Sequence, residues 1–284
     1  MPGFASLRLA PLLLCAAAAA AVPPAAAQAL PDLDVPFVTT PDHVVDAMLA
    51  LAGVTERDFV LDLGSGDGRI VITAALKSGA RGMGVEIDPA LVRLSNENAR
   101  KAGVADRARF AEQDLFATDL AQASVITMYL LPDVNLKLRP ELLKLRPGTR
   151  IVSHDWDMGD WQPDGKVVLD VPDKKLGLDK KSTLLLWKIP AAVEGGWSSG
   201  KRLRLNLRQR YQMLEGEVTY RGQTYPAASG RVDGTRVQLC FAQHDTGRCR
   251  LGALGRLAGH ELRLLIDGAG RRQVTVMAHR DGSR

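Results

Sequence analysis

The segment 60–68, with the sequence VLDLGSGDG, places three glycines and two carboxylates at the expected junction of a strand and a helix. Gly64, Gly66 and Gly68 let the backbone turn sharply and approach a ligand where a Cβ would clash. A helix that begins near Arg69 would offer free N–H groups and the positive end of its dipole. The loop is therefore predicted to bind a ligand, although dinucleotide-binding proteins use a similar turn.

Charge distinguishes this loop, which also contains Ser65, from the dinucleotide loop. The dinucleotide pattern has a third glycine five residues after the first, and this chain has Arg69 there. Asp62 and Asp67 put negative charge where a diphosphate would have to lie. A sulfonium with a zwitterionic methionine tail tolerates both carboxylates, and its ammonium gains from one of them. The loop therefore favours S-adenosylmethionine as the cofactor.

Acidic residues also follow the next two expected strands. Glu86 ends the second strand, where a carboxylate can accept hydrogen bonds from both ribose hydroxyls, with Ile87 beside it. Asp114 follows the third strand, where it could accept a hydrogen bond from the adenine amino group while Leu115 packs on the ring. Each acid alone is typical of an ordinary surface. Their register at successive strand ends, together with the glycine loop, indicates a nucleoside site.

Residues after the fourth and fifth expected strands are candidates for the acceptor side. A lysine acceptor must lose a proton before it is methylated, because its unperturbed pKa is about 10.4. Tyr129 is the catalytic candidate, and packing against the cofactor is its alternative role. The remaining candidates fit either the acceptor pocket or packing and capping: Asn135, His154, Asp155, Trp156 and Trp161.

The elements that position these residues alternate between strand and helix. Strands are expected at 59–63, 82–87, 108–112, 124–130, 150–154, 166–171 and 183–189, and helices at 42–51, 69–78, 89–102 and 133–145. Such alternation predicts an α/β fold, a Rossmann-like seven-stranded sheet within residues 36–190. The last two strands should pair antiparallel, because the turn between them is too short for a crossover.

The first half of the chain resembles a known family. Residues 36–163, which begin Pro-Phe-Val-Thr-Thr-Pro and include LDLGSGDGRIVI, are similar to the protein-lysine methyltransferases of ATP synthase c subunit and adenine nucleotide translocase, and more so to their bacterial homologues. Many methyltransferases share the loop, whereas the segment 36–41 and its spacing to the loop are more specific. The resemblance implies a class I fold, S-adenosylmethionine, a lysine target, and cofactor contacts at Asp62, Gly64, Gly66, Glu86 and Asp114.

Three functions remain open. The leading one is S-adenosylmethionine-dependent protein-lysine N-methylation. The second is N- or O-methylation of a small molecule, with the C-terminal domain as a lid or docking arm. The third is a non-catalytic nucleoside-binding protein of the envelope. The expected partner is a methyl-acceptor protein or small molecule, with membrane proximity possible and no nucleic acid. No metal-ligand spacing occurs among the histidines and cysteines.

The C-terminal region has a different pattern. Gly195–Gly200 is expected to be a linker, and beyond it apolar residues recur with period two. This predicts a small all-β domain at 197–284, a barrel or sandwich of six or seven short strands. Residues 200–284 contain 16 basic and 7 acidic side chains. Such a surface is either a solvated face or an attractor of phosphates or anionic lipid.

The N-terminus is typical of an export signal. Arg8 precedes the apolar run Leu9–Val22, and Ala27-Gln28-Ala29 follows as a small-residue site, so residues 1–29 are predicted to be a signal peptide cleaved after Ala29. The chain is then periplasmic or secreted, and it is cytoplasmic or membrane-tethered if the segment stays uncleaved. Cys240 and Cys249 would remain, as a disulfide or as two buried thiols.

Overall fold

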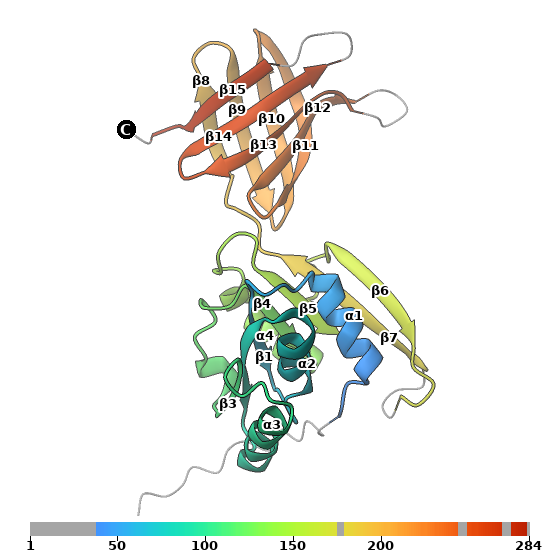
Figure 1. Cartoon of the computed structure of the whole chain (residues 1–284). Helices are drawn as coiled ribbons and strands as arrows, with labels where there is room; N and C mark the ends of the chain where they lie inside the picture. Colours follow the sequence, from blue (N-terminus) through green and yellow to red (C-terminus); the bar gives the residue numbers. More distant parts are fainter. Residues whose placement is uncertain (1–37, 175–178, 244–248, 269–273, 283–284) are drawn as a thin grey trace, which may run out of the picture. The chain divides into compact units, whose positions relative to one another are not determined.

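The computed structural model describes residues 38–174, 179–243, 249–268 and 274–282, so the predicted signal peptide at 1–29 lies outside the described residues. An α/β part comes first along the chain and an all-β part follows it (Figure 1). Within the described ranges, no helix has the length and apolar character needed to cross a membrane. Nor do three or more potential metal-ligating side chains meet anywhere in them.

The α/β part contains the predicted seven-stranded sheet. Its strands, in their order across the sheet, are β3 (Ala108–Glu112), β2 (Arg81–Glu86), β1 (Phe59–Leu63), β4 (Val125–Met128), β5 (Arg150–His154), β7 (Lys181–Lys188) and β6 (Gly165–Asp170). The first five are parallel, and β7 pairs antiparallel with both β5 and β6; the β6–β7 pairing was predicted. Strand β4 is buried at every position, as a central parallel strand must be.

Helices cover both faces of this sheet (Figure 1). On one face, α1 (Asp42–Ala52) and α2 (Arg69–Ser78) pack on Val60, and α3 (Pro89–Lys101) packs beside α2. On the other face, α4 (Pro132–Leu142) packs on Leu61. Asp88 caps the N-terminus of α3, because its carboxylate accepts a hydrogen bond from the Ala90 N–H at 2.7 Å.

Several predicted boundaries in this part are wrong by one to three residues, among them those of the fourth strand and the fourth helix. The strand expected at 124–130 is shorter, because after Met128 the chain leaves the sheet and begins the turn into α4. The helix expected at 133–145 begins one residue earlier and ends at Leu142, after which turn hydrogen bonds such as Leu145 N–H to Leu142 C=O replace the helical ones. Neither change moves a candidate site residue away from its strand end.

The sheet order creates one position suited to a ligand. Strand β1 lies between β2 and β4, so the chain crosses from β1 toward β3 and later returns to the other side of β1. In open α/β sheets, ligands bind beyond the carboxyl ends of the strands at such a switch point. Asp62, Glu86, Asp114 and Tyr129 all lie at or just after the carboxyl ends of these four strands.

The all-β part is a closed eight-stranded barrel (Figure 1). The predicted linker at Gly195–Gly200 is wrong, since Gly195–Ser199 forms strand β8, which pairs with both β9 and β15 and closes the barrel. Trp197 explains this, because it is fully buried in the barrel core. The other strands are β9 (Leu203–Arg210), β10 (Met213–Tyr220), β11 (Gln223–Asp233), β12 (Arg236–Gln243), β13 (Cys249–Ala258), β14 (Glu261–Gly268) and β15 (Val274–Arg280).

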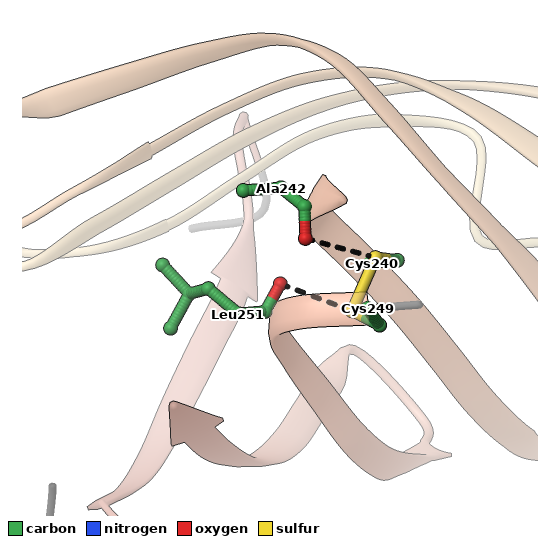
Figure 2. The surroundings of a disulfide bond; sticks show 4 residues. All are labelled: Cys240, Ala242, Cys249 and Leu251. Atoms are coloured by element: carbon green, nitrogen blue, oxygen red, sulfur yellow. Dashed lines mark hydrogen bonds between the residues drawn. A yellow bond between two sulfur atoms is a disulfide. The ribbon is translucent and has the colours of Figure 1, made fainter. Parts of the chain in front are cut away.

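The two cysteines left open by the sequence form a disulfide between β12 and β13 (Figure 2). The Cys240 sulfur lies 3.4 Å from the Ala242 carbonyl oxygen, and the Cys249 sulfur lies 3.3 Å from that of Leu251. The register between the two strands shifts at Cys240 and Ala242. The cross-link thus joins the strands where their backbone pairing is least regular.

Candidate active site

The glycine loop between β1 and α2 uses its three glycines differently. Gly64, Gly66 and Gly68 all have left-handed φ angles, of 74°, 55° and 81°. A Cβ on Gly64 would lie 3.0 Å from the Leu130 side chain, whereas a Cβ on Gly68 would lie 2.5 Å from the Phe110 ring. Gly68 therefore serves the packing of the loop against β3, and Gly64 keeps the switch point free of side-chain atoms.

Asp62 is the most buried carboxylate of the site. Its side chain accepts a hydrogen bond from the Thr127 hydroxyl at 2.7 Å, and the residue is only 2% exposed. Burial raises the pKa of Asp62 to about 7; the Thr127 hydrogen bond opposes this shift, and the charges of Glu86 and Asp67 add to it. A carboxylate in this state gains strongly from a cationic ligand, because the cation favours its ionised form.

Glu86 connects the end of β2 to the glycine loop. One carboxylate oxygen accepts from the Gly66 N–H at 3.0 Å, and the other accepts from the Ile87 N–H at 2.8 Å. These bonds fix the carboxylate at the strand end, where a ribose would meet it. Ile87 is 48% exposed, so a large apolar side chain lies uncovered beside the carboxylate.

Asp114 and Leu115 follow the end of β3, the strand next to β2 in the sheet. The Asp114 carboxylate accepts from the Phe116 N–H at 2.8 Å and caps a short helical turn, η1 (Leu115–Ala117). Leu115 is partly buried against the core of the α4 face. Asp114 is thus held in place by a cap, and Leu115 is only partly available to a ligand.

Asp67 has a partner that the sequence interpretation left out. Arg69 donates to its carboxylate from Nε at 2.9 Å and from Nη2 at 2.5 Å. Treating Asp67 as an uncompensated charge was therefore wrong, because the guanidinium neutralises it. Discrimination against a diphosphate then depends on Asp62 and Glu86.

The loop fits S-adenosylmethionine on three observations. A Cβ at Gly64 would have one atom within 4 Å, on the Leu130 side chain, so the space beside this backbone is otherwise open. Asp62 is a buried carboxylate that lacks a cationic partner among the described residues. Ser65 is buried and its hydroxyl has no hydrogen-bond partner in the described part of the chain. Buried polar groups are normally satisfied, so these two side chains indicate a polar, cationic ligand.

On the acceptor side, Tyr129 and His154 lie against each other with their ring centroids 3.9 Å apart. The Tyr129 hydroxyl donates to Asp155 at 3.2 Å, and Lys174 Nζ lies 2.7 Å from the same carboxylate oxygen. The other oxygen of Asp155 accepts from the Thr183 N–H at 2.9 Å. A tyrosine, a carboxylate and an ammonium group therefore meet beyond the ends of β4 and β5.

Three of these side chains, those of Tyr129, His154 and Lys174, line a pocket of about 220 Å³, and Asp155 lies behind them. The pocket is lined by Val38, Thr39, Pro41, Tyr129, His154, Asp173, Lys174 and Ser182. A larger depression of about 600 Å³, lined by residues 54–57 and Lys77, lies before the start of β1 and contains no candidate residue. The chemistry therefore belongs to the smaller pocket.

Protonation states follow from burial. Desolvation raises the pKa of Tyr129 to about 12, and the adjacent Asp155 charge adds to the shift. Desolvation lowers the pKa of His154 to about 4, although Asp155 opposes this. At neutral pH the phenol is therefore a hydrogen-bond donor and the imidazole is neutral, held by Ser182 at 2.8 Å. The Tyr129 phenol is therefore not available as a base at neutral pH.

The other residues predicted to line the acceptor pocket differ in their exposure and in what they contact. Trp156 is 42% exposed, whereas Trp161 is fully buried in the core. Asn135 is buried and its amide donates to the Trp156 and Asp157 carbonyl oxygens, so it holds the loop after β5 and does not line the pocket. Sequence reasoning missed Lys174, which lies in no recognisable pattern, and it gave Thr40 no role although this residue belongs to the segment 36–41.

Comparisons with known proteins agree with this geometry. Residues 62–165 match the ANTKMT methyltransferase domain. A protein-lysine N-methyltransferase of Saccharolobus islandicus is 45% identical over 49% of this chain and 86% of that protein. The adenine nucleotide translocase lysine N-methyltransferase of Mus musculus is 36% identical, over 46% of this chain and 57% of that protein.

A solved structure is also similar to the α/β part. It is a chain from Salinibacter ruber, titled an RNA methyltransferase in complex with S-adenosyl-L-homocysteine. The two are 53% identical, with a TM-score of 0.50, over 55% of this chain and 96% of that one. This neighbour was thus crystallised with the demethylated product of S-adenosylmethionine.

Proposed function

We propose a substrate for this chain from one premise: it belongs to the family of protein-lysine N-methyltransferases. It is a methyltransferase that uses S-adenosylmethionine. The proposed acceptor is a lysine side chain of a protein. The observation that carries this proposal is the Asp155 carboxylate, which holds the alkylammonium of Lys174, a residue that lines the acceptor pocket.

Some residues of the site would bind the methyl donor, and the others would bind the methyl acceptor. S-adenosylmethionine supplies a methyl group on a sulfonium that is already a good leaving group. Asp62 receives the ammonium of the methionine tail, and Glu86 receives the ribose hydroxyls. Ile87 and Asp114 receive the adenine. With S-adenosylmethionine held by these residues, an acceptor would approach from the carboxyl ends of β4 and β5, on the Tyr129 side of the switch point.

On the acceptor side, Asp155 and Tyr129 orient the incoming amine. Asp155 has a left-handed backbone with φ 65°, which turns its carboxylate toward Tyr129. The Tyr129 phenol stays protonated and donates to Asp155, so one carboxylate lone pair is fixed and others remain for the ammonium. The amine loses its proton to solvent, and alignment in a partly dry pocket supplies most of the rate.

The test uses the purified protein and methyl-labelled S-adenosylmethionine with a cell extract separated into protein, RNA and small molecules. The proposal predicts label on protein lysines, and no label with Glu86→Gln, which cannot accept from both ribose hydroxyls and Gly66 as a carboxylate does. Label in the small-molecule fraction alone would reject the proposed acceptor.

RNA is a second candidate acceptor, because the Salinibacter ruber chain of 53% identity is titled an RNA methyltransferase. The arginine-rich C-terminal region, with 16 basic against 7 acidic side chains in residues 200–284, would attract a phosphate backbone. Label that appears in RNA and not in protein, and that is lost at high salt, would favour RNA over lysine as the methyl acceptor.

We also propose that the protein works outside the cytoplasm. The charged, apolar and small-residue order of residues 1–29 supports export, and the Cys240–Cys249 disulfide suits an oxidising compartment. Sequencing the N-terminus of the protein from fractionated cells tests this. A mature protein that begins at Leu30 outside the cytoplasm is expected, and an intact Met1 in the cytoplasm would reject it.

A further inference from the structure

Lys174 occupies the acceptor side of the site in an unusual way. Its Nζ lies 2.7 Å from an Asp155 carboxylate oxygen, and its side chain is only 14% exposed. The Tyr129 hydroxyl donates to the same Asp155 oxygen. Lys174 Nζ also donates to the Lys181 carbonyl oxygen at 2.5 Å. An amine is therefore fixed, from within the chain, at the carboxylate that would receive a substrate amine.

The order of strands in the sheet indicates where the Lys174 amine lies relative to the methyl donor. The residues suited to the nucleoside follow β2 and β3, and Asp62 at the end of β1 suits the methionine tail. The sulfonium joins those two portions of the molecule, so its methyl would be offered on the side of the next strands, β4 and β5. Tyr129 follows β4 and Asp155 follows β5, and Lys174 reaches the pocket from the turn between β6 and β7.

The geometry points to Lys174 as a methylation site of this protein, modified in cis by its own active site; this inference rests on the proposed function. The Lys174 ammonium first releases a proton to solvent. Its nitrogen lone pair then forms the N–CH3 bond while the S–CH3 bond of S-adenosylmethionine breaks. The electron pair of the broken bond stays on sulfur, which gives S-adenosylhomocysteine and methyl-lysine.

The neighbouring lysines supply matched controls. Lys180 lies in the same turn, Lys181 is the first residue of β7, and both are exposed. Lys180 Nζ donates to the Lys174 carbonyl oxygen and not to Asp155. Among the described lysines, Lys174 is the one whose Nζ pairs with Asp155. Methylation directed by the site should therefore select Lys174, whereas adventitious methylation should favour the exposed lysines.

The test incubates the full-length protein with methyl-labelled S-adenosylmethionine and maps the modified peptides by mass spectrometry. We expect methylated Lys174, unmodified Lys180 and Lys181, and a first-order rate that does not change on dilution of the protein. Lys174→Arg should remove the label, and Lys180→Arg should keep it. An unmodified Lys174 in a preparation that methylates an acceptor protein would overturn the inference and leave the proposed function standing. A dilution-dependent rate, or equal label on Lys180 and Lys181, would also overturn it.

A second readout needs no methyl transfer. In the protein without S-adenosylmethionine, an amine-reactive reagent should modify Lys174 at least about tenfold more slowly than Lys180 and Lys181, because a charge-assisted bond protects it. Asp155→Asn should raise the Lys174 rate toward that of its neighbours and leave theirs unchanged. Equal rates in the unaltered protein would show that Asp155 does not hold this amine, and would overturn the inference.

Discussion

Arg69 donates from Nη1 to the Thr40 carbonyl oxygen at 2.8 Å, and this bond joins the cofactor loop to the segment that covers the acceptor pocket. Arg69 also neutralises Asp67, and the Thr40 hydroxyl lies 3.3 Å from His154 Nδ1. The residue that replaces the third glycine of the dinucleotide pattern thus connects the two halves of the site.

Arg69→Lys should separate cofactor binding from acceptor methylation. Lysine keeps a positive charge near Asp67, but it lacks the planar fork that serves Asp67 and Thr40 together. We expect S-adenosylmethionine affinity within about threefold of the unaltered protein and acceptor kcat/KM lowered about tenfold, the cost of one charge-assisted hydrogen bond. Calorimetry and methylation kinetics measure the two effects, and unchanged kinetics would refute the connecting role.

Tyr129→Phe should lower the rate of acceptor methylation without weakening the binding of S-adenosylmethionine. The ring still packs on His154, but the hydroxyl no longer donates to Asp155. A lost hydrogen bond to a charged group costs about 1.5–3 kcal/mol, so acceptor kcat/KM should fall by about 10- to 100-fold. Tyr225→Phe, in the barrel, is the matched control. A drop in S-adenosylmethionine affinity as large as the drop in kcat/KM would instead place Tyr129 against the cofactor.

Gly68→Ala should unfold the α/β part more easily than Gly103→Ala. Both glycines have left-handed φ angles, of 81° and 69°, so both substitutions cost the backbone strain of about 1 kcal/mol. Only the Gly68 position is crowded, because a Cβ there would lie 2.5 Å from Phe110, whereas nothing lies within 4 Å of a Cβ at Gly103. Urea unfolding should show an additional loss of about 1–3 kcal/mol for Gly68→Ala. Equal losses would contradict the packing role.

Removal of the disulfide should weaken the barrel and spare the cofactor site. Cys240 and Cys249 are separated by 9 residues in sequence, so the cross-link closes a short loop worth about 2–3 kcal/mol of chain entropy. The double substitution Cys240→Ser with Cys249→Ser should lower the free energy of unfolding of the barrel by that amount. S-adenosylmethionine affinity should stay the same, and a large loss of affinity would mean that the barrel supports the site directly.

Much of the α/β part could be predicted from the sequence because its strands are short, apolar and bounded by glycine or polar residues. The strands at 59–63, 108–112 and 150–154 match residue for residue. The order of strands across the sheet could not be predicted in the same way, since pairing depends on contacts between distant segments. Strand β8 was mistaken for a linker, because four of its five residues are glycine or serine and only the burial of Trp197 reveals its role.

For the site, strand-end acids were predictable and their partners were not. Asp62 and Glu86 follow from position alone, whereas the pairing of Asp67 with Arg69 depends on side-chain directions in the loop. Lys174 lies in a lysine-rich turn that is typical of a solvated surface. Only the folded structure brings Lys174 to Asp155.

The most direct test of the site is the pH dependence of S-adenosylmethionine binding to the unaltered protein and to Asp62→Asn. Because the pKa of Asp62 is raised to about 7 in the free protein and a bound ammonium should lower it, binding must release a proton and weaken as the pH falls. Calorimetry between pH 7.5 and 5.5 should show affinity falling about 10- to 30-fold in the unaltered protein. Asp62→Asn should bind about 10- to 100-fold more weakly at pH 7.5, with little further change. Equal affinities of the two proteins across this range would contradict the assignment of Asp62 to the cofactor.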